Sequence, residues 1–298
     1  MSLLSLLPEV RGEYRENANI AKTTWFGVGG QAEVLFRPKD VDDLANFRGK
    51  ISSDIKVSIL GVGSNLLIRD GGIKGVVIKL GKSFVEMIYS NKIIEVGAGA
   101  LNYNLANYCK DLSLSGLEFL VGIPGSVGGS IAMNAGAYGS DISSQLLKVE
   151  AIDRDGNITI LRNEDVGFVY RGNTLDEGWI FTKAWFKISE GNKEEIENRM
   201  QEIHSARENS QPIRSKTSGS TFKNPTGYKA WELIDRSGCR GLKIGDAIVS
   251  EKHCNFLINL GNATASDIED LGEEVRRRVL NQTGIDLMWE IIRIGDKF

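Results

Sequence analysis

The chain has 298 residues, 41% hydrophobic and 25% charged, which is enough for two globular domains with a sizeable core. Its formal net charge of −3 argues against non-specific nucleic-acid binding. Three cysteines without C-x-x-C spacing and two histidines argue against a disulfide framework and a metal centre, and no apolar run is long enough to cross a membrane. We therefore expect a cytoplasmic protein that uses no metal and binds neither nucleic acid nor membrane.

The first fifty residues predict two helices and no nucleotide-binding turn. Residues 2–20 indicate a short helix followed by a polar lead-in. The segment Gly27–Ala32 has the spacing G-x-G-x-x-A, but an extended run at 34–36 follows where a dinucleotide-binding turn requires a helix. Asp40–Arg48 predicts a helix with Asp40 as its N-cap.

Two further glycine loops also lack a complete Rossmann fingerprint. A strand at 57–60 leads into Gly61–Asn65, and a second strand follows this loop instead of a helix. Gly97–Gly99 does lie between a strand and the helix predicted over Leu101–Leu112. However, Asn102 occupies the position where the fingerprint requires Gly or Ala.

The stretch Val121–Gly139, VGIPGSVGGSIAMNAGAYG, contains six glycines and few large side chains. Glycine lets the backbone approach a bound group closely and leaves N–H donors to point at it. We interpret this stretch as a cradle for the phosphates of a large cofactor. A glycine-rich turn between two elements is the alternative.

The middle of the chain predicts short neighbouring strands with interspersed helices. Residues 147–161 form a hairpin that turns at Asp155–Gly156, and residues 179–188 form a further strand. An amphipathic helix follows over 191–210. We expect an α+β fold with a domain boundary near the end of this helix.

The remainder predicts a second, smaller domain that binds an anion. Arg207–Lys243 carries eight basic and three acidic residues in a chain whose total charge is negative. With the hydroxyls and amides of SGSTFKNPTG, these charges favour a site for a sugar nucleotide, and a solvated basic surface is the alternative. The predicted elements are a helix over Lys229–Arg236, strands near 247–249 and 255–260, a helix from the capping box Ser266–Glu269 to Gly284, and a terminal strand, MWEIIRI, that carries Glu290.

The side chains that could carry chemistry are not distinctive one by one. No G-x-S-x-G elbow surrounds Ser220, which argues against a Ser-His-Asp hydrolase. A lone acid such as Glu290 in an apolar strand is more often paired or solvent-facing than catalytic, and Arg171 is equally unremarkable alone. His253, beside a strand, is typical of a structural histidine.

Seven motifs in series carry a resemblance that no single motif carries. In chain order they are GVGGQAEV, LGVGSNLLIRDGG, GIPGSVGGSIAMNAGAYG, YRGN, SGSTFKNP, SEKHCNFLIN and WEIIRIG. Their order and separations closely resemble those of the UDP-N-acetylenolpyruvoylglucosamine reductase (MurB) family, over nearly the whole chain. The resemblance implies an FAD-dependent, NADPH-oxidising enzyme of peptidoglycan precursor synthesis, with no obligate protein partner.

The resemblance also implies a domain plan. An FAD-binding domain of the vanillyl-alcohol-oxidase (PCMH) type precedes a smaller α+β domain that binds the UDP-sugar. The limits that we expect are 1–20 for an N-terminal helix and lead-in, 21–190 for the FAD-binding domain with subdomains of about 21–80 and 81–190, 191–206 for a connecting helix, and 207–298 for the substrate domain.

The same resemblance assigns roles to single residues. Arg171, Ser220 and Glu290 match the catalytic positions of the family. The residues expected at FAD are Gly61, Gly63, Ser64, Asn65, Gly125, Ser126, Gly128, Gly129, Asn134 and Gly136. The residues expected at the substrate are Tyr138, Tyr170, Arg214, Lys223, Asn224 and Arg293.

The implied reaction has two halves. NADPH reduces FAD, and the flavin N5 hydride then adds to the β-carbon of the enolpyruvyl ether. Arg171 and Glu290 would stabilise the enolate that forms, and Ser220 would protonate the α-carbon, with Lys223 steadying the alkoxide. The product would be UDP-N-acetylmuramate.

The chain departs from longer members of the family, which carry an inserted tyrosine loop over the substrate. No tyrosine lies between Tyr170 and Gln211, so the chain resembles the shorter, type II form of the family. Two other functions stay open from the residues alone: another flavin oxidoreductase on the same scaffold, or a sugar-nucleotide-binding protein without redox activity.

Overall fold

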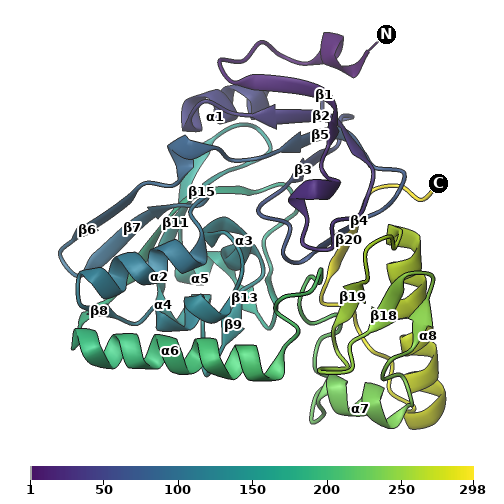
Figure 1. Ribbon diagram of the computed structural model, residues 1–298. Helices are drawn as coiled ribbons and strands as arrows, with labels where there is room; N and C mark the ends of the chain where they lie inside the picture. The colour runs from purple at the N-terminus through teal and green to yellow at the C-terminus, as the bar shows by residue number, and fades with distance from the viewer. Residues whose placement is uncertain (1) are drawn as a thin grey trace. The chain divides into compact units, whose positions relative to one another are not determined.

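The computed structural model describes residues 2–298, which form two compact units (Figure 1). The first unit consists of the chain up to Glu16, Val34–Gly61 and Gly75–Ala206, and the second of Asn17–Glu33, Val62–Lys74 and Arg207–Phe298. Two early segments therefore group with the C-terminal residues, whereas the sequence predicted a linear division. The domain limits stay a prediction.

A four-stranded sheet has the strand order β1-β2-β5-β3. Its strands are β1 (Glu13–Asn19), β2 (Gln31–Arg37), β5 (Ile73–Ile78) and β3 (Val57–Ile59). Helix α1 (Val41–Lys50) starts after Asp40, whose side chain accepts a hydrogen bond from the Asp43 N–H, so the predicted N-cap is confirmed. The short helix expected within 2–20 forms as the 3-10 helix η1 (Leu3–Leu6), and the polar lead-in contains strand β1.

A five-stranded antiparallel sheet forms the centre of the first unit, in the order β12-β11-β15-β7-β6. Its strands are β12 (Ile158–Arg162), β11 (Leu146–Ile152), β15 (Ile180–Lys187), β7 (Ile93–Gly97) and β6 (Met87–Ser90). The predicted hairpin is confirmed, because Ile152 pairs with Ile158 across the turn. Alternating residues of β15 are buried, as a strand with one covered face requires.

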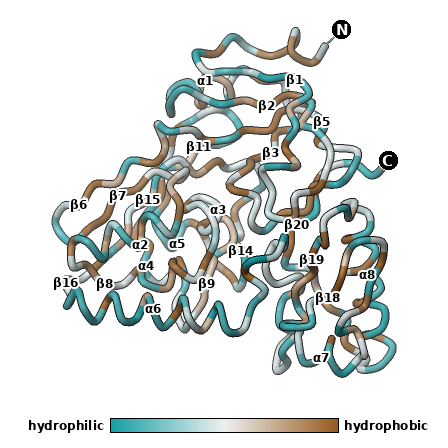
Figure 2. The backbone as a smooth tube through the Cα atoms, viewed as in Figure 1, coloured by the Kyte–Doolittle hydropathy of each residue, from teal (hydrophilic) through white to brown (hydrophobic). Residues whose placement is uncertain are grey.

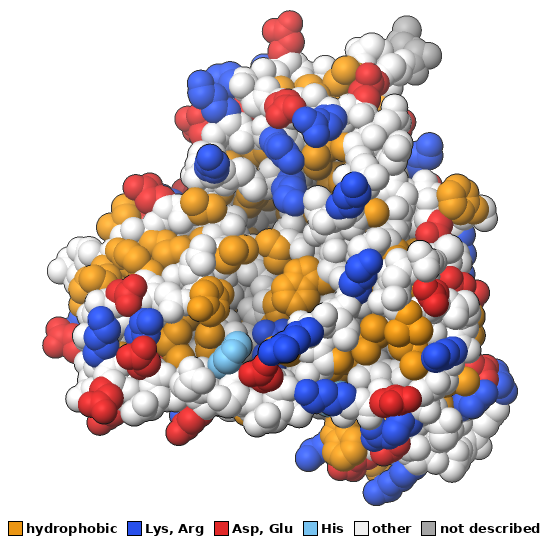
Figure 3. Space-filling view, in the orientation of Figure 1, with side chains coloured by type: hydrophobic (Ala, Val, Ile, Leu, Met, Phe, Trp, Pro, Cys, Tyr) orange, Lys and Arg blue, Asp and Glu red, His pale blue; other side chains and the backbone are white. Residues whose placement is uncertain are grey.

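Helices cover the buried face of this sheet. The core includes side chains from β7, β11 and β15 and from the helices α2 (Asn102–Asp111), α3 (Val127–Ala132) and α6 (Lys193–Ser210). Figure 2 shows α6 as largely hydrophilic, because only its buried side, with Ile196, Met200 and Ile203, is apolar. Hydrophobic side chains also gather at the surface over β6, β7 and α2 (Figure 3), where Ile88 and Tyr103 are exposed.

Short elements complete the first unit and position its loops. They are η3 (Lys82–Phe84), β8 (Leu114–Ser115), η4 (Glu118–Gly122), β9 (Gly136–Ala137), β10 (Ser140–Asp141), α4 (Ile142–Gln145), α5 (Asn163–Val166), β13 (Phe168–Val169), β14 (Gly172–Asn173) and β16 (Ser189–Glu190). The glycine-rich stretch therefore contains a short helix, α3, which the sequence did not predict.

The second unit combines three helices with small sheets. Strands β17 (Lys243–Ile244), β18 (Ala247–Val249) and β19 (Leu257–Asn259) are antiparallel, and β4 (Leu66–Ile68) pairs in parallel with the terminal strand β20 (Ile292–Ile294). The helices are η2 (Ala21–Thr23), α7 (Ala230–Arg236) and α8 (Ala265–Thr283).

Two details of the second unit differ from expectation. The capping box of α8 is formed by Thr264 and Asp267, two residues earlier than predicted, although the helix does end at Gly284 with a positive φ of 72°. The terminal strand is shorter than predicted, so Glu290 precedes β20 instead of lying in it. The α+β fold class is confirmed.

Candidate functional site

Arg171 lies in a two-residue hairpin turn of the first unit. Strands β13 and β14 pair through Val169 and Gly172, which leaves Tyr170 and Arg171 as the turn. Arg171 has a φ of 57°, a backbone conformation that is uncommon for a residue with a side chain. Its Nη2 donates to the Gly136 carbonyl at 3.1 Å, and its guanidinium lies 5.0 Å from the centre of the Tyr170 ring.

Asn134 connects this hairpin to the glycine-rich stretch. Its Nδ2 donates to the Val169 carbonyl at 3.1 Å, and its Oδ1 accepts from the Ser143 N–H at 3.1 Å. Asn134 is buried and also has a positive φ, of 40°. Because both polar groups of the side chain are used, this expected FAD residue also holds the Arg171 turn in place.

Tyr138 occupies a second strained turn. Strands β9 and β10 leave Tyr138 and Gly139 as a two-residue connection, and both have positive φ values. The Tyr138 ring covers Gly122 so closely that a Cβ at Gly122 would lie 2.6 Å from Tyr138 Cε2. Strained backbone that is held by surrounding contacts clusters at functional sites, and here Asn134, Tyr138 and Arg171 share it.

The cradle that we expected from the glycine loops lies at the start of α3, where Gly61 and Ser126 meet. A Cβ on Gly61 would come within 2.9 Å of Ser126 Oγ, so two glycine loops of the first unit meet there. The backbone hydrogen bonds of residues 2–298 do not use the N–H groups of Gly61, Gly125 and Ser126. Neighbouring backbone amides that no protein acceptor uses are the kind of donor that binds a pyrophosphate.

The neighbouring glycines have packing roles. The Gly128 N–H donates to the Ala98 carbonyl at 2.8 Å, and a Cβ on Gly128 would lie 3.0 Å from Ala98 Cβ. The Gly129 N–H is capped by Ser126 Oγ. Asn102, which made a Rossmann turn unlikely in the sequence, instead donates from Nδ2 to the Ile123 carbonyl and to Ser130 Oγ, and thereby anchors the glycine-rich stretch.

Ser220 and Glu290 are brought together in the second unit. Ser220 forms a bridge with Phe256, and the next residue, Thr221, accepts at its carbonyl from the Glu290 N–H at 2.8 Å. Ser220 and Glu290 are both half-buried. The Lys223 N–H donates to the Met288 carbonyl, which continues the same pairing.

The loop that carries Asn65 joins this group. Asn65 Nδ2 donates to the Glu290 carbonyl at 3.1 Å, and the Asn65 carbonyl accepts from the Ile292 N–H. Gly63, with a φ of 66°, accepts at its carbonyl from the Trp25 N–H. An expected FAD residue and an expected catalytic residue are therefore in direct contact, 225 positions apart in the chain.

Other expected substrate residues already have protein partners. Asn224 Oδ1 accepts from the Ala230 N–H, at the first residue of α7. Arg214 is highly exposed and pairs with Glu208 at 3.0 Å. Arg293 stacks 4.3 Å from the Trp289 ring. Their contact with substrate stays a prediction.

Arg293 belongs to an ion cluster that the sequence did not predict. Glu269 is buried and accepts from Arg69 Nε at 2.9 Å, from Arg69 Nη2 at 3.0 Å and from Arg293 Nη1 at 3.1 Å. The hydrogen bond from Arg69 holds the pKa of Glu269 below its ordinary value. Arg69 directly follows β4, so the cluster ties β4 and β20 to α8.

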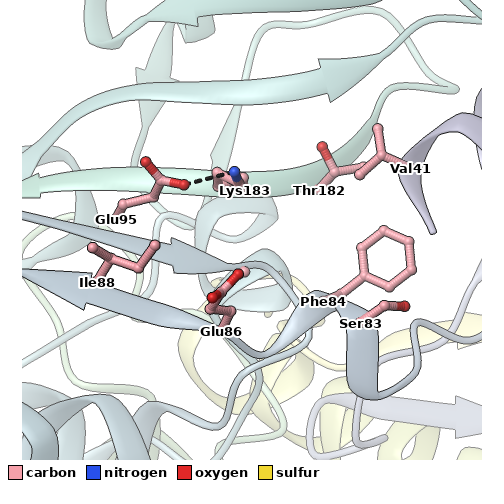
Figure 4. Close-up of a pocket in the computed structure, with 9 residues that line it drawn as sticks. Val41, Ser83, Phe84, Glu86, Ile88, Glu95, Thr182 and Lys183 are labelled. Carbon is pink, nitrogen blue, oxygen red and sulfur yellow. Dashed lines mark ion pairs between the residues drawn. The ribbon is translucent and has the colours of Figure 1, made fainter.

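The first unit also contains a small pocket, away from the expected site residues (Figure 4). Its volume is about 110 Å³, and its nine lining residues include none of the expected site residues. Lys183 and Glu95 form an ion pair of 2.6 Å across it, which lowers the pKa of Glu95. A cavity of that size holds a few waters, whereas ligand sites measure about 300–1,000 Å³.

Two known domain families match this chain. Residues 32–162 match the family model "FAD binding domain", and residues 211–294 match "UDP-N-acetylenolpyruvoylglucosamine reductase, C-terminal domain". Together, these matches confirm the expected sequence of an FAD-binding domain and a smaller C-terminal domain.

Curated relatives match along nearly their whole length. The UDP-N-acetylenolpyruvoylglucosamine reductase of Rickettsia bellii (strain RML369-C) is 51% identical over 290 residues, 97% of this chain and 96% of its own. That of Rickettsia typhi (strain Wilmington) is 50% identical over 98% of this chain and 99% of its own.

A solved structure agrees with the sequence comparison. The crystal structure of the MurB enzyme from Thermus caldophilus superposes with a TM-score of 0.82 at 38% identity, covering 96% of this chain and all of that one. None of the helices within residues 2–298 is both long and apolar enough to span a bilayer. With half of its residues shared over almost the full length, this chain belongs to the UDP-N-acetylenolpyruvoylglucosamine reductase family.

Proposed function

We propose that the chain is an FAD-containing reductase that uses NADPH to convert UDP-N-acetylglucosamine enolpyruvate to UDP-N-acetylmuramate for peptidoglycan synthesis. The observation that carries the proposal is the pairing of both family domains in one chain with about half of its residues shared with curated relatives. The unpaired amides of the cradle add support from geometry.

The residues of the cradle fit the cofactor. The N–H groups of Gly61, Gly125 and Ser126 would hold the pyrophosphate of FAD, because each offers a donor that no described backbone group uses. Asn134 and Gly136, beyond the far end of α3, would lie toward the flavin and the substrate. The expected roles of Gly128 and Gly129 become indirect, since their amides are engaged within the protein.

The side chains of the chain would act on the substrate in a defined order. When bound, FAD supplies the hydride that adds to the β-carbon of the enolpyruvyl group. Arg171 would stabilise the negative charge that develops on the α-carbon and carboxylate, since a fixed guanidinium needs no reorganisation. Ser220 Oγ would then donate a proton to the α-carbon, and Lys223 would stabilise the resulting alkoxide.

Glu290, whose N–H donates to the residue after Ser220, would act on the same enolate. Its carboxyl would stabilise the enolate when protonated, or would orient a donor toward it. We further propose that residues 21–190 bind FAD, that residues 207–298 bind the UDP-sugar, and that neither a protein nor a nucleic acid partner is required. A cytoplasmic location is supported by three buried, unpaired cysteines, which are typical of a reducing compartment.

A visible absorption spectrum with anaerobic kinetics tests the proposal. We expect purified protein to be yellow, to be bleached by NADPH, and to regain its colour when the enolpyruvyl substrate is added without oxygen. A colourless protein that cannot be reconstituted with FAD would reject the proposal. Flavin that is reduced by NADPH but not reoxidised by this substrate would indicate another flavin oxidoreductase.

A further inference from the structure

Asn255 has a buried side chain that is used entirely on one backbone residue. It is only 4% exposed. Its Oδ1 accepts from the Phe222 N–H at 2.9 Å, and its Nδ2 donates to the Phe222 carbonyl at 2.8 Å. The amide thus replaces a neighbouring strand for Phe222, since it pairs with both backbone polar groups of that residue.

The backbone of Asn255 reinforces the same contact. Its carbonyl accepts from the Thr221 N–H at 2.7 Å, and Phe256 forms the bridge with Ser220. Residues 220–222 are therefore held along one edge by residues 255 and 256.

The opposite edge of this segment carries the residues before the terminal strand. Phe222 forms a bridge with Trp289, and their rings lie 5.1 Å apart. The Thr221 carbonyl accepts from the Glu290 N–H. Thr221 and Phe222 therefore form a middle row between two segments, residues 255–256 on one side and residues 289–290 on the other. Ser220 directly precedes this row, and Glu290 pairs with Thr221 across it.

Other side chains described in the structure give this middle row packing but no hydrogen bond. Thr221 Oγ1 is buried and has no hydrogen-bond partner among residues 2–298. The Phe222 ring is apolar and 1% exposed, so it packs against Trp289 and keeps this residue on the buried face, but it offers no hydrogen bond. The only side chain with directional bonds to this row is that of Asn255, among the contacts that the structure describes.

We propose that Asn255 is a positioning residue, which sets the register of Ser220 against Glu290. The inference rests on the proposed function, because it concerns the proton donor of that reaction. If the Phe222 carbonyl loses its partner, the segment shifts to find another, since a buried carbonyl rarely stays unpaired. Ser220 moves with it, and delivery of the proton to the α-carbon slows, whereas reduction of FAD by NADPH does not require this register.

The Asn255→Asp variant tests this directly. Aspartate keeps the shape and the acceptor for the Phe222 N–H, but places an oxygen instead of an N–H against the Phe222 carbonyl. The matched control is Asn259→Asp. Asn259 is also 4% exposed, its Oδ1 accepts from the N–H groups of Gly261 and Ala263, and its Nδ2 donates to the Phe26 carbonyl. Both variants lose one buried amide donor in the same unit.

Three measurements on the FAD-loaded proteins separate positioning from general destabilisation. They are the rate of flavin reduction by NADPH, the rate of anaerobic reoxidation by the enolpyruvyl substrate in H₂O and in D₂O, and amide hydrogen exchange of residues 219–224 and 288–292. In Asn255→Asp we expect reoxidation to slow about 10- to 100-fold, as for a catalytic group displaced by about 1 Å. Its solvent isotope effect should rise and exchange should accelerate in both segments, while flavin reduction changes less than about twofold.

The control should lower stability without these changes. Equal slowing of reoxidation in Asn255→Asp and Asn259→Asp, or unchanged exchange at 219–224 in Asn255→Asp, would overturn the inference. Wild type that carries FAD but is not reoxidised by the substrate would reject the proposed function itself. If Asn255→Asp does not fold, Asn255→Ala, which removes both bonds without adding charge, is measured in the same way and judged by the same outcomes.

Discussion

Replacing Glu269 by glutamine should destabilise the second unit by about 2–3 kcal/mol at pH 7. The wild-type carboxylate is buried and accepts three hydrogen bonds from two arginines, Arg69 and Arg293. A hydrogen bond to a charged group contributes about 1.5–3 kcal/mol, and breaking a fully buried pair costs about 3–5 kcal/mol. The arginine side chains are about a quarter exposed, at 27% and 25%, so water compensates part of the loss.

The pH dependence follows from the same contacts. The hydrogen bond from Arg69 lowers the pKa of Glu269 below its ordinary value of 4.5. The folded state therefore binds this proton less readily than the unfolded state does, and stability falls as the pH drops below 4.5 toward the folded-state pKa. Glutamine cannot titrate, so the difference between wild type and Glu269→Gln should shrink over this acid range.

Urea unfolding followed by tryptophan fluorescence and circular dichroism at several pH values measures both effects. Asp270→Asn is the matched control, because Asp270 lies on the same helix, α8, with an exposed side chain. We expect a much smaller loss there. A loss below about 0.5 kcal/mol for Glu269→Gln at pH 7, or a difference from wild type that stays constant down to pH 3, would refute the reasoning.

Three further substitutions test the site. Ser220→Ala should leave flavin reduction by NADPH nearly intact and slow reoxidation by the substrate sharply in stopped-flow absorbance, whereas equal loss of both halves would mean that Ser220 is structural. Arg171→Ala should lose turnover far more than FAD content, and purification as apo-protein would contradict its catalytic role. Gly122→Ala should raise the KM for the UDP-sugar, because the new Cβ would lie 2.6 Å from Tyr138 Cε2 and 2.9 Å from Ile203 Cγ2. Such overpacking costs about 1–3 kcal/mol, and an unchanged KM would show that the Tyr138 ring does not contact substrate.

The local features of this protein follow from its amino-acid sequence. Glycine spacing excluded a Rossmann turn, because each candidate lacked the helix or the third small residue that this turn requires. Hydrophobic periodicity located α2, α6 and β15 to within two residues. The motifs in series indicated the family, which the relatives then confirmed. These features depend on residues within a few positions of one another, so they can be predicted from the order of residues in the chain.

Contacts between residues that are far apart in the chain are visible only in the folded structure. Asn65 reaches Glu290 across 225 positions, Arg69 reaches Glu269 across 200, and Asn255 reaches Phe222 across 33. The sequence assigned no role to Asn255, although it lies in one of the motifs. A side-chain amide can bond to any backbone group, and only the fold shows that its partner is Phe222. Register, burial and the pairing of charges arise from contacts between segments, and for that reason the positioning residues of this site emerge only in the folded chain.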